Sequence, residues 1–429
     1  MLRRWLYVIW LLLGVFVISA CRDVAPTPPS GEVTTSYPVD SGEASVTLVP
    51  LSPYPVGTAT AVSTPATHSS PAPVGDNQQF LPLLTNPQPT QTAVPTATPV
   101  PIPPTPTPIP TIDVAALTAQ LQASGLQFVP VKIGFHVGVG GNSRYLDEWM
   151  TQLDAAGIPF FLKSVDNAQP ILFAQELMKK SGVPHVLVFR KTSNEISYDV
   201  PDYNLPPEEA ARQHWQIHMA AFPPELDPSL VWLETINEVD KTRAEWLGAF
   251  ALETAQLALR DGFKWAAFGW SSGEPEPEHW QTPSMLAFLR LAGQYPDRLA
   301  VALHEYSFVQ DNIADGYPFK IGRFLELFRI CDQYGIPRPT VLITEWGWTY
   351  QTVPAPQQAI EDIAWAAGLY APYPQVKGAA IWYLGNGFGG IADQAQKLIR
   401  PLTQFTLTHY YTAPLPPAQA PTDPTQFLP

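Results

Sequence analysis

The sequence of 429 residues predicts an α/β protein, a (β/α)8 TIM barrel preceded by a signal segment and a long proline-rich linker. Between about residues 112 and 412, short apolar runs rich in Val, Ile, Phe and Trp alternate with longer segments of helical periodicity. Several helical segments end in Gly just before the next apolar run, as in "AAGIPF" and "LRDGFKW". An open doubly wound sheet is the alternative, but it rarely needs so many consecutive parallel units.

Eight β-strands are expected in this region, which matches the size and order of a closed barrel. They are residues 131–137, 158–165, 185–190, 231–237, 263–270, 300–306, 340–346 and 378–384. The helices expected between them are residues 144–156, 169–180, 208–221, 241–260, 282–293, 324–334 and 356–370. Chemistry in this fold belongs at the C-terminal ends of the strands, so polar residues there are the candidates for function.

The chain begins "MLRRWLYVIWLLLGVFVISAC", with two arginines, an apolar stretch and small residues before Cys21. This layout is typical of a secretory signal. The last four letters resemble the bacterial lipobox, which implies that residues 1–21 are a lipoprotein signal peptide and that Cys21 is lipidated. A plain membrane span followed by an incidental cysteine is the alternative. Either interpretation places the rest of the chain on the extracellular face of the bacterial membrane.

Two segments have a composition that cannot bury enough apolar surface to fold. Residues 22–111 are rich in Pro, Thr and Ser and end in "PTATPVPIPPTPTPIPT", so we expect a disordered linker in extended polyproline geometry that holds the barrel away from the membrane. An unconstrained low-complexity region is the alternative. Residues 413–429 are expected to be a disordered C-terminal tail. The catalytic domain is therefore predicted at residues 112–412.

Composition narrows the class of partner. The net charge of −14 argues against nucleic acid, because binding a phosphate backbone requires clustered Lys and Arg. The 13 Trp and 16 Tyr provide flat faces that suit sugar rings, although aromatic residues also fill cores. Only two cysteines occur, in unrelated contexts, so no disulfide framework is expected.

The strand ends carry a set of polar and aromatic residues. The fourth strand ends in Asn237 and Glu238, and the seventh ends in Glu345. Because these strands lie across the barrel mouth from each other, the two glutamates can face one another over a ligand. A retaining glycosidase requires two such carboxylates about 5 Å apart, one protonated and one ionised.

With His-x-Tyr at the sixth strand and Trp at the eighth, these residues resemble the clan A glycoside hydrolases. The phrase "WLETINE" is similar to the fourth-strand phrase W-x-E-x-x-N-E of some members. Val239 stands where the family often has Pro, which leaves the loop geometry open. The resemblance implies an acid/base at Glu238, a nucleophile at Glu345 and sugar-binding or supporting roles for Asn237, His304, Tyr306, Trp382 and, as candidate for the family's arginine, Arg190.

Further residues have two interpretations. His136 precedes the glycine-rich "GVGGNS" and either contacts substrate or fills the core. Trp346 is a candidate for stacking on sugar, together with Trp270 and Trp348. Glu234 is interpreted as a buried acid inside the barrel, below the mouth. Glu305 is interpreted as structural, because strand alternation points it away from His304 and Tyr306.

No metal site and no cofactor are expected. His214 and His218 have metal-ligand spacing on a helix, but no "HExxH" and no third ligand accompany them, so a structural role is favoured. Cys331 is expected to be a buried thiol on the apolar face of a helix.

The sequence thus predicts a monomeric, membrane-tethered extracellular glycoside hydrolase that cleaves O-glycosidic bonds of a poly- or oligosaccharide by a retaining mechanism. The alternative is a non-catalytic carbohydrate-binding or adhesion lipoprotein on the same barrel. The glutamate pair separates the two, since a pure binding protein has no need for it.

Overall fold

A computed structural model describes residues 49–50, 112–192, 196–309, 312–417 and 419–427. The expected signal peptide with Cys21, and all of the expected linker except Val49 and Pro50, lie outside the described residues. Within the described ranges, no helix combines the length and the apolar character needed to cross a bilayer.

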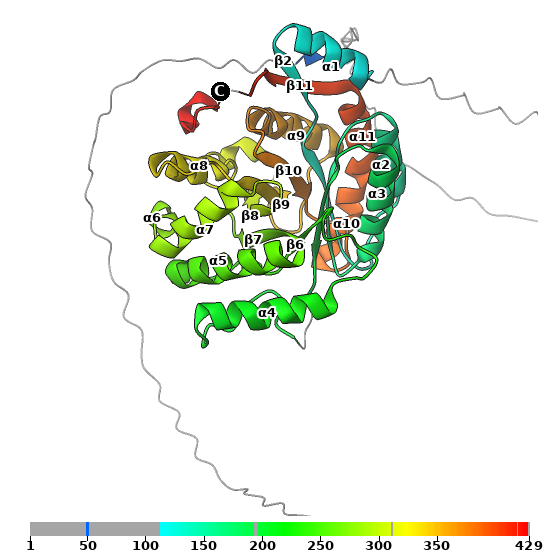
Figure 1. Cartoon of the computed structure of the whole chain (residues 1–429). Coiled ribbons are helices and arrows are strands. Elements are labelled where there is room, and N and C mark those ends of the chain that lie inside the picture. Colours follow the sequence, from blue (N-terminus) through cyan, green and yellow to red (C-terminus); the bar gives the residue numbers. More distant parts are fainter. Residues whose placement is uncertain (1–48, 51–111, 193–195, 310–311, 418, 428–429) are drawn as a thin grey trace, which may run out of the picture. The chain divides into compact units, whose positions relative to one another are not determined.

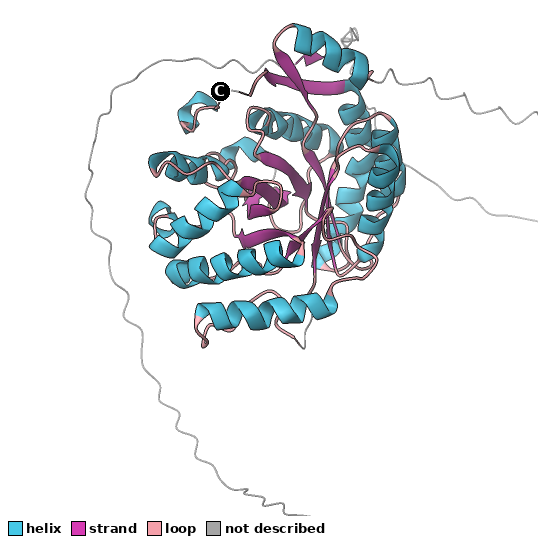
Figure 2. Ribbon diagram, viewed as in Figure 1, coloured by secondary structure: helices cyan, strands magenta, loops and turns pink. Residues whose placement is uncertain are grey.

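Eight parallel strands form a closed barrel in which each strand pairs with the next along the chain and the last pairs with the first (Figures 1 and 2). The predicted barrel is therefore confirmed, and the closure excludes an open sheet. The strands are β3 (Ile133–Val137), β4 (Phe161–Val165), β5 (Val186–Arg190), β6 (Val231–Glu234), β7 (Lys264–Trp270), β8 (Leu299–Tyr306), β9 (Thr340–Gly347) and β10 (Val376–Ile381).

The fourth barrel strand, β6, is shorter than the sequence predicts. It leaves the ladder after Glu234, and the backbone N–H of Asn237 then donates to the carbonyl of Asp199 in the loop after β5. The next N–H, that of Glu238, donates to the carbonyl of Gly269, and Glu238 itself has a left-handed φ of 46°. This turn replaces the expected end of the strand, so both residues face the barrel mouth without strict alternation.

Helices surround the barrel, and the expected ones occur within about three residues of their predicted ends. They are α2 (Leu146–Ala155), α3 (Ala168–Ser181), α4 (Pro207–Ala221), α5 (Ala244–Asp261), α7 (Pro283–Gln294), α8 (Phe324–Gln333) and α9 (Pro356–Tyr370). The sequence did not predict α6 (Pro277–Trp280), α10 (Ile391–Ala395) and α11 (Ile399–Thr408). Gly182 and Gly262 end α3 and α5 with φ near 80–85°, as the glycine pattern predicts.

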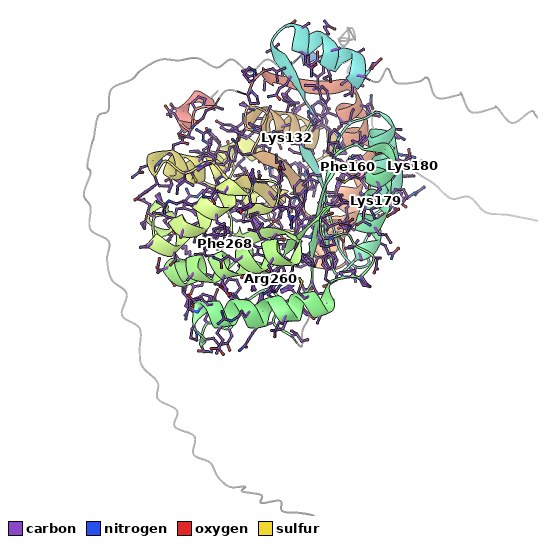
Figure 3. All side chains as sticks on the ribbon, viewed as in Figure 1. Lys132, Phe160, Lys179, Lys180, Arg260 and Phe268 are labelled. Atoms are coloured by element: carbon purple, nitrogen blue, oxygen red, sulfur yellow. The ribbon has the colours of Figure 1, made fainter. Side chains whose placement is uncertain are left out.

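The core has two layers. Side chains between the barrel and the helices form the larger one, and Phe160 and Phe268 are labelled in Figure 3 within this packing. Phe160 stacks on His185 with ring centroids 3.7 Å apart. The next residue, Phe161, points into the barrel, where it joins a small apolar layer that includes Val188 and Trp232. Polar side chains occur above that layer, toward the C-terminal ends of the strands.

A small antiparallel sheet, not predicted from the sequence, accompanies the barrel. It contains β1 (Val49–Pro50), β11 (His409–Pro414) and β2 (Leu126–Val129), with β11 in the middle. Helix α1 (Val114–Ala123) precedes β2, and Ile112, Leu121 and Tyr410 form a separate apolar cluster beside it. Residues from both ends of the described chain therefore meet in one sheet.

The expectation of a disordered tail from Ala413 is wrong for the described residues. Arg338 donates to the carbonyl of Ala420 at 2.7 Å, and the hydroxyl of Tyr373 donates to the carbonyl of Pro421 at 2.6 Å. A short 3-10 helix follows at Pro424–Phe427. Proline-rich composition did not reveal this order because the donors that satisfy the backbone carbonyls come from remote parts of the chain.

Candidate active site

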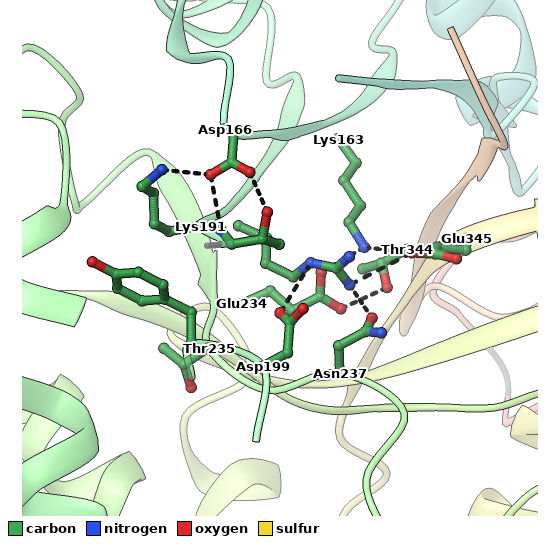
Figure 4. Close-up of polar contacts among 12 residues, drawn as sticks. Lys163, Asp166, Lys191, Asp199, Glu234, Thr235, Asn237, Thr344 and Glu345 are labelled. Atoms are coloured by element: carbon green, nitrogen blue, oxygen red, sulfur yellow. Dashed lines mark hydrogen bonds and ion pairs between the residues drawn. The ribbon is translucent and has the colours of Figure 1, made fainter. Parts of the chain in front are cut away.

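Glu238 and Asn237 are presented by the turn after β6. The side chain of Glu238 is 48% exposed and lies at the mouth. Asn237 accepts a hydrogen bond through its Oδ1 from the guanidinium of Arg190, which ends β5 (Figure 4). The backbone bonds to Asp199 and Gly269 fix both residues in place.

Glu345 lies near the end of β9, and its side chain is only 10% exposed. Its Oε2 accepts a hydrogen bond of 2.8 Å from the hydroxyl of Tyr306. Its Oε1 lies 3.4 Å from Nζ of Lys163 and 3.5 Å from the guanidinium of Arg190 (Figure 4). The carboxylate is therefore held on both oxygens by donors from three other strands.

One imidazole connects the two glutamates. Nδ1 of His304, on β8, lies 3.1 Å from Oε1 of Glu238 and 3.6 Å from Oε2 of Glu345. These two distances limit the gap between the two carboxylate oxygens to about 7 Å, a range that includes the ~5 Å spacing of an acid and nucleophile pair. The structure thus brings together the two glutamates that the sequence singled out.

The surroundings of Glu345 favour its ionised form. Burial alone would raise the pKa of its carboxyl, but the electrostatic effects of the nearby His304, Lys163 and Arg190 outweigh burial and hold this pKa well below its usual range. Glu345 is therefore ionised at neutral pH.

Glu238 has a more open environment. Its hydrogen bond with His304 lowers the pKa of its carboxyl, against the opposing effects of partial burial and of the negative charge on Glu345. Ser271 adds a second hydrogen bond in the same direction. In the unliganded site both carboxyls therefore have lowered pKa values, with the stronger effect on Glu345.

Below the two glutamates at the mouth lies a cluster of buried polar side chains, of which the sequence predicted only Glu234. Nζ of Lys163 lies 2.7 Å from Oε2 of Glu234, and the hydroxyl of Thr344 donates to the other oxygen at 2.8 Å. Lys163 and Glu234 are completely buried, as expected for Glu234. The missed signal was a lysine at an inward position of the apolar strand "FFLKSV".

A cavity of about 370 Å³ opens above the glutamates. Three aromatic rings on loops after β8, β9 and β10 form part of its wall: Phe308 (53% exposed), Tyr350 (64%) and Phe388 (43%). The ring of Tyr350 stacks on Trp382 with centroids 6.2 Å apart. The sequence predicted Trp382 at this place but not the other three, since nothing in a loop sequence fixes where its aromatic residues point.

His136 reaches the same region from β3. It is 1% exposed, and its Nδ1 lies 4.0 Å from Oε1 of Glu345. Among the described residues, neither ring nitrogen has a hydrogen-bond partner. Burial, followed by the charge of Lys163, holds the pKa of His136 well below its usual range, so the imidazole is neutral.

Trp346 does not reach the mouth, which corrects the prediction of a stacking role. It is completely buried and packs on Trp348 with ring centroids 5.0 Å apart. The reason is the alternation along β9, in which Glu345 faces inward and the next residue faces the helices. Trp270 and Trp348 are buried as well, so of the four tryptophans considered, Trp382 alone lines the cavity.

The residues interpreted as structural lie outside the mouth. The carboxylate of Glu305 accepts hydrogen bonds from the backbone N–H of Gly322 and Arg323 and from the hydroxyl of Tyr370. His214 and His218 are buried and contact the backbone carbonyls of Thr235 and Tyr198. Cys331 is buried, which raises its pKa to about 12. The described part of the chain contains no group of three side chains suited to a metal ion.

No protein-family model and no curated protein matches the chain. It is similar to the structure of an endo-beta-1,4-glucanase from Xanthomonas axonopodis pv. citri, at 13% identity over 63% of this chain and 99% of that chain, with a TM-score of 0.37. A tri-modular GH5 (subfamily 4) endo-beta-1,4-glucanase from Bacillus licheniformis matches at 13% identity over 62% of this chain and 59% of that chain, with a TM-score of 0.37.

An aldolase from Escherichia coli K12 also matches, at 8% identity over 65% of this chain and 92% of that chain, with a TM-score of 0.32. At these identities and TM-scores the matches carry no argument about activity. The fold rests on the closed barrel itself, which defines the chain as a (β/α)8 protein with two glutamates at its mouth.

Proposed function

We propose that the protein is a glycoside hydrolase that cleaves O-glycosidic bonds with retention of configuration, with Glu345 as nucleophile and Glu238 as acid/base. The observation that carries this proposal is the pair of contacts from Nδ1 of His304 to the two glutamates. Two carboxylates whose oxygens lie within about 7 Å of each other at the mouth of a barrel are close enough for the two-step displacement.

In the first step a carboxylate oxygen of Glu345 attacks the anomeric carbon while Glu238 protonates the departing oxygen. The C–O bond to the leaving group breaks and a glycosyl ester forms on Glu345. In the second step Glu238, now ionised, takes a proton from water, and the resulting hydroxide displaces Glu345 from the same carbon. The hydrogen bond from Tyr306 orients the attacking carboxylate.

The lowered pKa of Glu238 must rise for it to act as an acid. In the free site its carboxyl is half exposed to water. A sugar bound over it removes that water, and loss of solvation favours the neutral acid. The negative charge of Glu345 acts in the same direction.

The cavity wall supports a poly- or oligosaccharide as substrate. Trp382, Tyr350 and Phe308 offer aromatic faces beside the two glutamates, and such faces stack on the apolar faces of sugar rings. A chain of sugars makes use of several such contacts, whereas a single ring does not.

The test is hydrolysis of 4-nitrophenyl glycosides by Glu345→Gln and Glu238→Gln. Each variant should lose at least about a thousandfold in kcat. Azide should restore turnover of the Glu238 variant on a substrate with a good leaving group, because a small anion needs no general base. Glu361→Gln, on the exposed face of α9, is the matched control and should keep full activity. Unchanged rates in both mouth variants contradict the proposal.

A second function is a surface carbohydrate-binding protein without turnover. The lowered pKa of Glu238 in the free site favours it, since an ionised Glu238 cannot protonate a leaving group. Isothermal titration calorimetry with oligosaccharides, combined with product analysis over hours, separates the two functions. Binding without product release supports the second.

We also propose that the barrel is tethered to the outer face of the bacterial membrane by a lipid on Cys21. The support is the sequence of the first 21 residues, which precede the described structure. Metabolic labelling with an alkynyl fatty acid should mark the wild type, and Cys21→Ser should lose both the label and the membrane fraction. A Cys21→Ser protein that stays in the membrane supports the plain span instead.

A further inference from the structure

A second cavity, of about 360 Å³, adjoins the first. The two share Arg190, Trp382 and Phe388 as a common wall, yet the second is lined by neither Glu238 nor Glu345. Its remaining wall comes from the C-terminal ends of β3 and β4, from the loops after β3, β4 and β5, and from Tyr383 after β10. A ligand that extends past Arg190 and Trp382 therefore enters a space that the proposed chemistry does not use.

The second cavity lies on the side of Glu345. Two of its lining residues contact that carboxylate: Arg190 at 3.5 Å and His136 at 4.0 Å. Ser271 and Ser272, by contrast, line the first cavity only, and Ser271 bonds with Glu238. Since the nucleophile bonds to the sugar that stays on the protein, the second cavity is placed to hold the unit beyond that sugar, away from the leaving group.

Unused polar atoms face this cavity. His136 lines it, is 1% exposed and has no hydrogen-bond partner for either ring nitrogen among the described residues. A neutral imidazole donates one hydrogen bond and accepts another. The side chain of Asp199 is 34% exposed, and its Oδ1 contacts Nε of Arg190 at 3.5 Å, which leaves carboxylate lone pairs available for a donor. Sugar hydroxyls supply both donors and acceptors.

The charges of the wall oppose a second anion. Nζ of Lys191 lies 2.7 Å from Asp166, and Arg190 is shared between Asp199 and Glu345. Each of these two cations is thus already opposed by a carboxylate of the wall, Asp166 for Lys191 and Asp199 for Arg190. A ligand carboxylate placed here would be desolvated without a free cation to pair with.

We propose that the second cavity is a subsite for a neutral sugar unit on the non-leaving side of the scissile bond, and that it rejects a unit bearing a carboxylate. This inference rests on the proposed glycosidase function. His136 and Asp199 bind the hydroxyls of this unit, and Trp382 borders both units from the shared wall.

The first test compares kcat/KM for matched 4-nitrophenyl substrates, β-glucoside with β-cellobioside, β-mannoside with β-mannobioside and β-xyloside with β-xylobioside. For the pair that is hydrolysed, kcat/KM for the disaccharide substrate should exceed kcat/KM for the monosaccharide substrate by about tenfold or more, because binding energy from the added unit is used in the transition state. Absence of turnover on all six counts against the glycosidase function. Equal turnover within a hydrolysed pair overturns the subsite alone.

The second test fills the cavity. Val139 lines it and is 59% exposed, so Val139→Trp should add bulk there without disturbing the core. In this variant the ratio of kcat/KM for the disaccharide to kcat/KM for the monosaccharide should fall toward one. Leu415→Trp, at a position that is also exposed (39%) and lies outside both cavities, is the control and should keep the wild-type ratio. A ratio unchanged in Val139→Trp overturns the proposal.

The third test addresses charge. The same disaccharide, oxidised at C6 of its distal unit to a uronic acid, should lose the tenfold gain in the wild type. Asp199→Asn removes one wall carboxylate and should narrow the difference between the neutral and oxidised substrates, chiefly through KM. If the oxidised substrate is preferred by the wild type, or if Asp199→Asn leaves the discrimination unchanged, the proposed selectivity is wrong.

Discussion

Nζ of Lys163 lies 2.7 Å from Oε2 of Glu234, and both side chains are completely buried inside the barrel. The same ammonium lies 3.4 Å from Oε1 of Glu345. Lys163 is therefore a positioning residue that links a buried structural acid to the proposed nucleophile. The ion pair with Glu234 holds the Lys163 ammonium in place, and from there its positive charge also stabilises the ionised carboxylate of Glu345.

Lys163→Met should destabilise the protein by about 3–5 kcal/mol, because it leaves Glu234 buried and unpaired. The double variant Lys163→Met/Glu234→Gln should recover a large part of that loss in urea denaturation. It should not recover the activity profile, since the pKa of Glu345 rises without the ammonium and the acidic limb of kcat/KM moves to higher pH. Equal stability of the single and double variants contradicts this account of the pair.

Tyr306→Phe removes the hydroxyl that donates to Glu345 at 2.8 Å. We expect kcat to fall by about 10- to 100-fold, because the attacking carboxylate loses an orienting hydrogen bond. Tyr334→Phe removes a surface hydroxyl that contacts Gln281 and should leave kcat unchanged. Steady-state kinetics of both variants on the best aryl glycoside is the measurement, and a full rate in Tyr306→Phe argues against the orienting role.

The pH dependence of kcat/KM follows from the two carboxyls of the free site. Glu345 must be ionised and Glu238 protonated, and both pKa values are lowered. Activity should therefore be highest in acid and fall about tenfold for each pH unit above the lowered pKa of Glu238, as the protonated fraction of this residue declines. The basic limb of the kcat profile should lie at higher pH than the basic limb of the kcat/KM profile, because bound sugar removes water from Glu238 and thereby raises its pKa. A kcat/KM that is flat up to neutral pH speaks against Glu238 as the acid.

His304→Gln offers a sharper version of the same test. The imidazole is the largest cause of the lowered pKa of Glu238 and also lowers that of Glu345. Both limbs of the kcat/KM profile should move to higher pH in the variant. A role in folding alone would lower the rate without moving either limb.

Glu305 makes a separate prediction about stability. Burial raises the pKa of its carboxyl to about 7, in spite of its hydrogen bonds from Gly322, Arg323 and Tyr370. The folded state therefore holds a proton that the unfolded chain releases near pH 4.5. The stability linked to this group is complete below about pH 4.5 and is lost, by roughly 3 kcal/mol at most, as pH rises through 7.

Glu305→Gln should flatten this dependence. The comparison is the free energy of unfolding in urea at pH 5 and pH 8 for the wild type and the variant. The drop between the two pH values should be larger in the wild type. An identical drop in both proteins would show that Glu305 does not titrate in this range.

The barrel and the glutamate pair could be predicted because both depend on order along the chain. Eight apolar runs alternate with helical segments, and the polar residues that end them fall at one rim whatever the details of packing. Glu238 and Glu345 were found in this way, as were His304, Tyr306 and Trp382.

Features that depend on contacts between remote residues could not be predicted. The turn that gives Glu238 a φ of 46° depends on backbone bonds to Asp199, in the loop after β5, and to Gly269, on β7. Trp346 was misplaced because its strand runs past Glu345 for two more residues and alternates there. Lys163 was visible as a charge in an apolar strand, but only the closed barrel shows that it lies beside Glu234.

Glu345 as the covalent nucleophile is the central claim, and mechanism-based trapping tests it most directly. A panel of aryl 2-deoxy-2-fluoroglycosides would be incubated with the protein, followed by intact-mass measurement and peptide mapping. The account predicts a mass increase of one fluorosugar for the glycoside whose parent is hydrolysed, located on Glu345 and absent in Glu345→Gln. A label on Glu238, or hydrolysis of the parent glycoside by an enzyme that takes up no label, would contradict it.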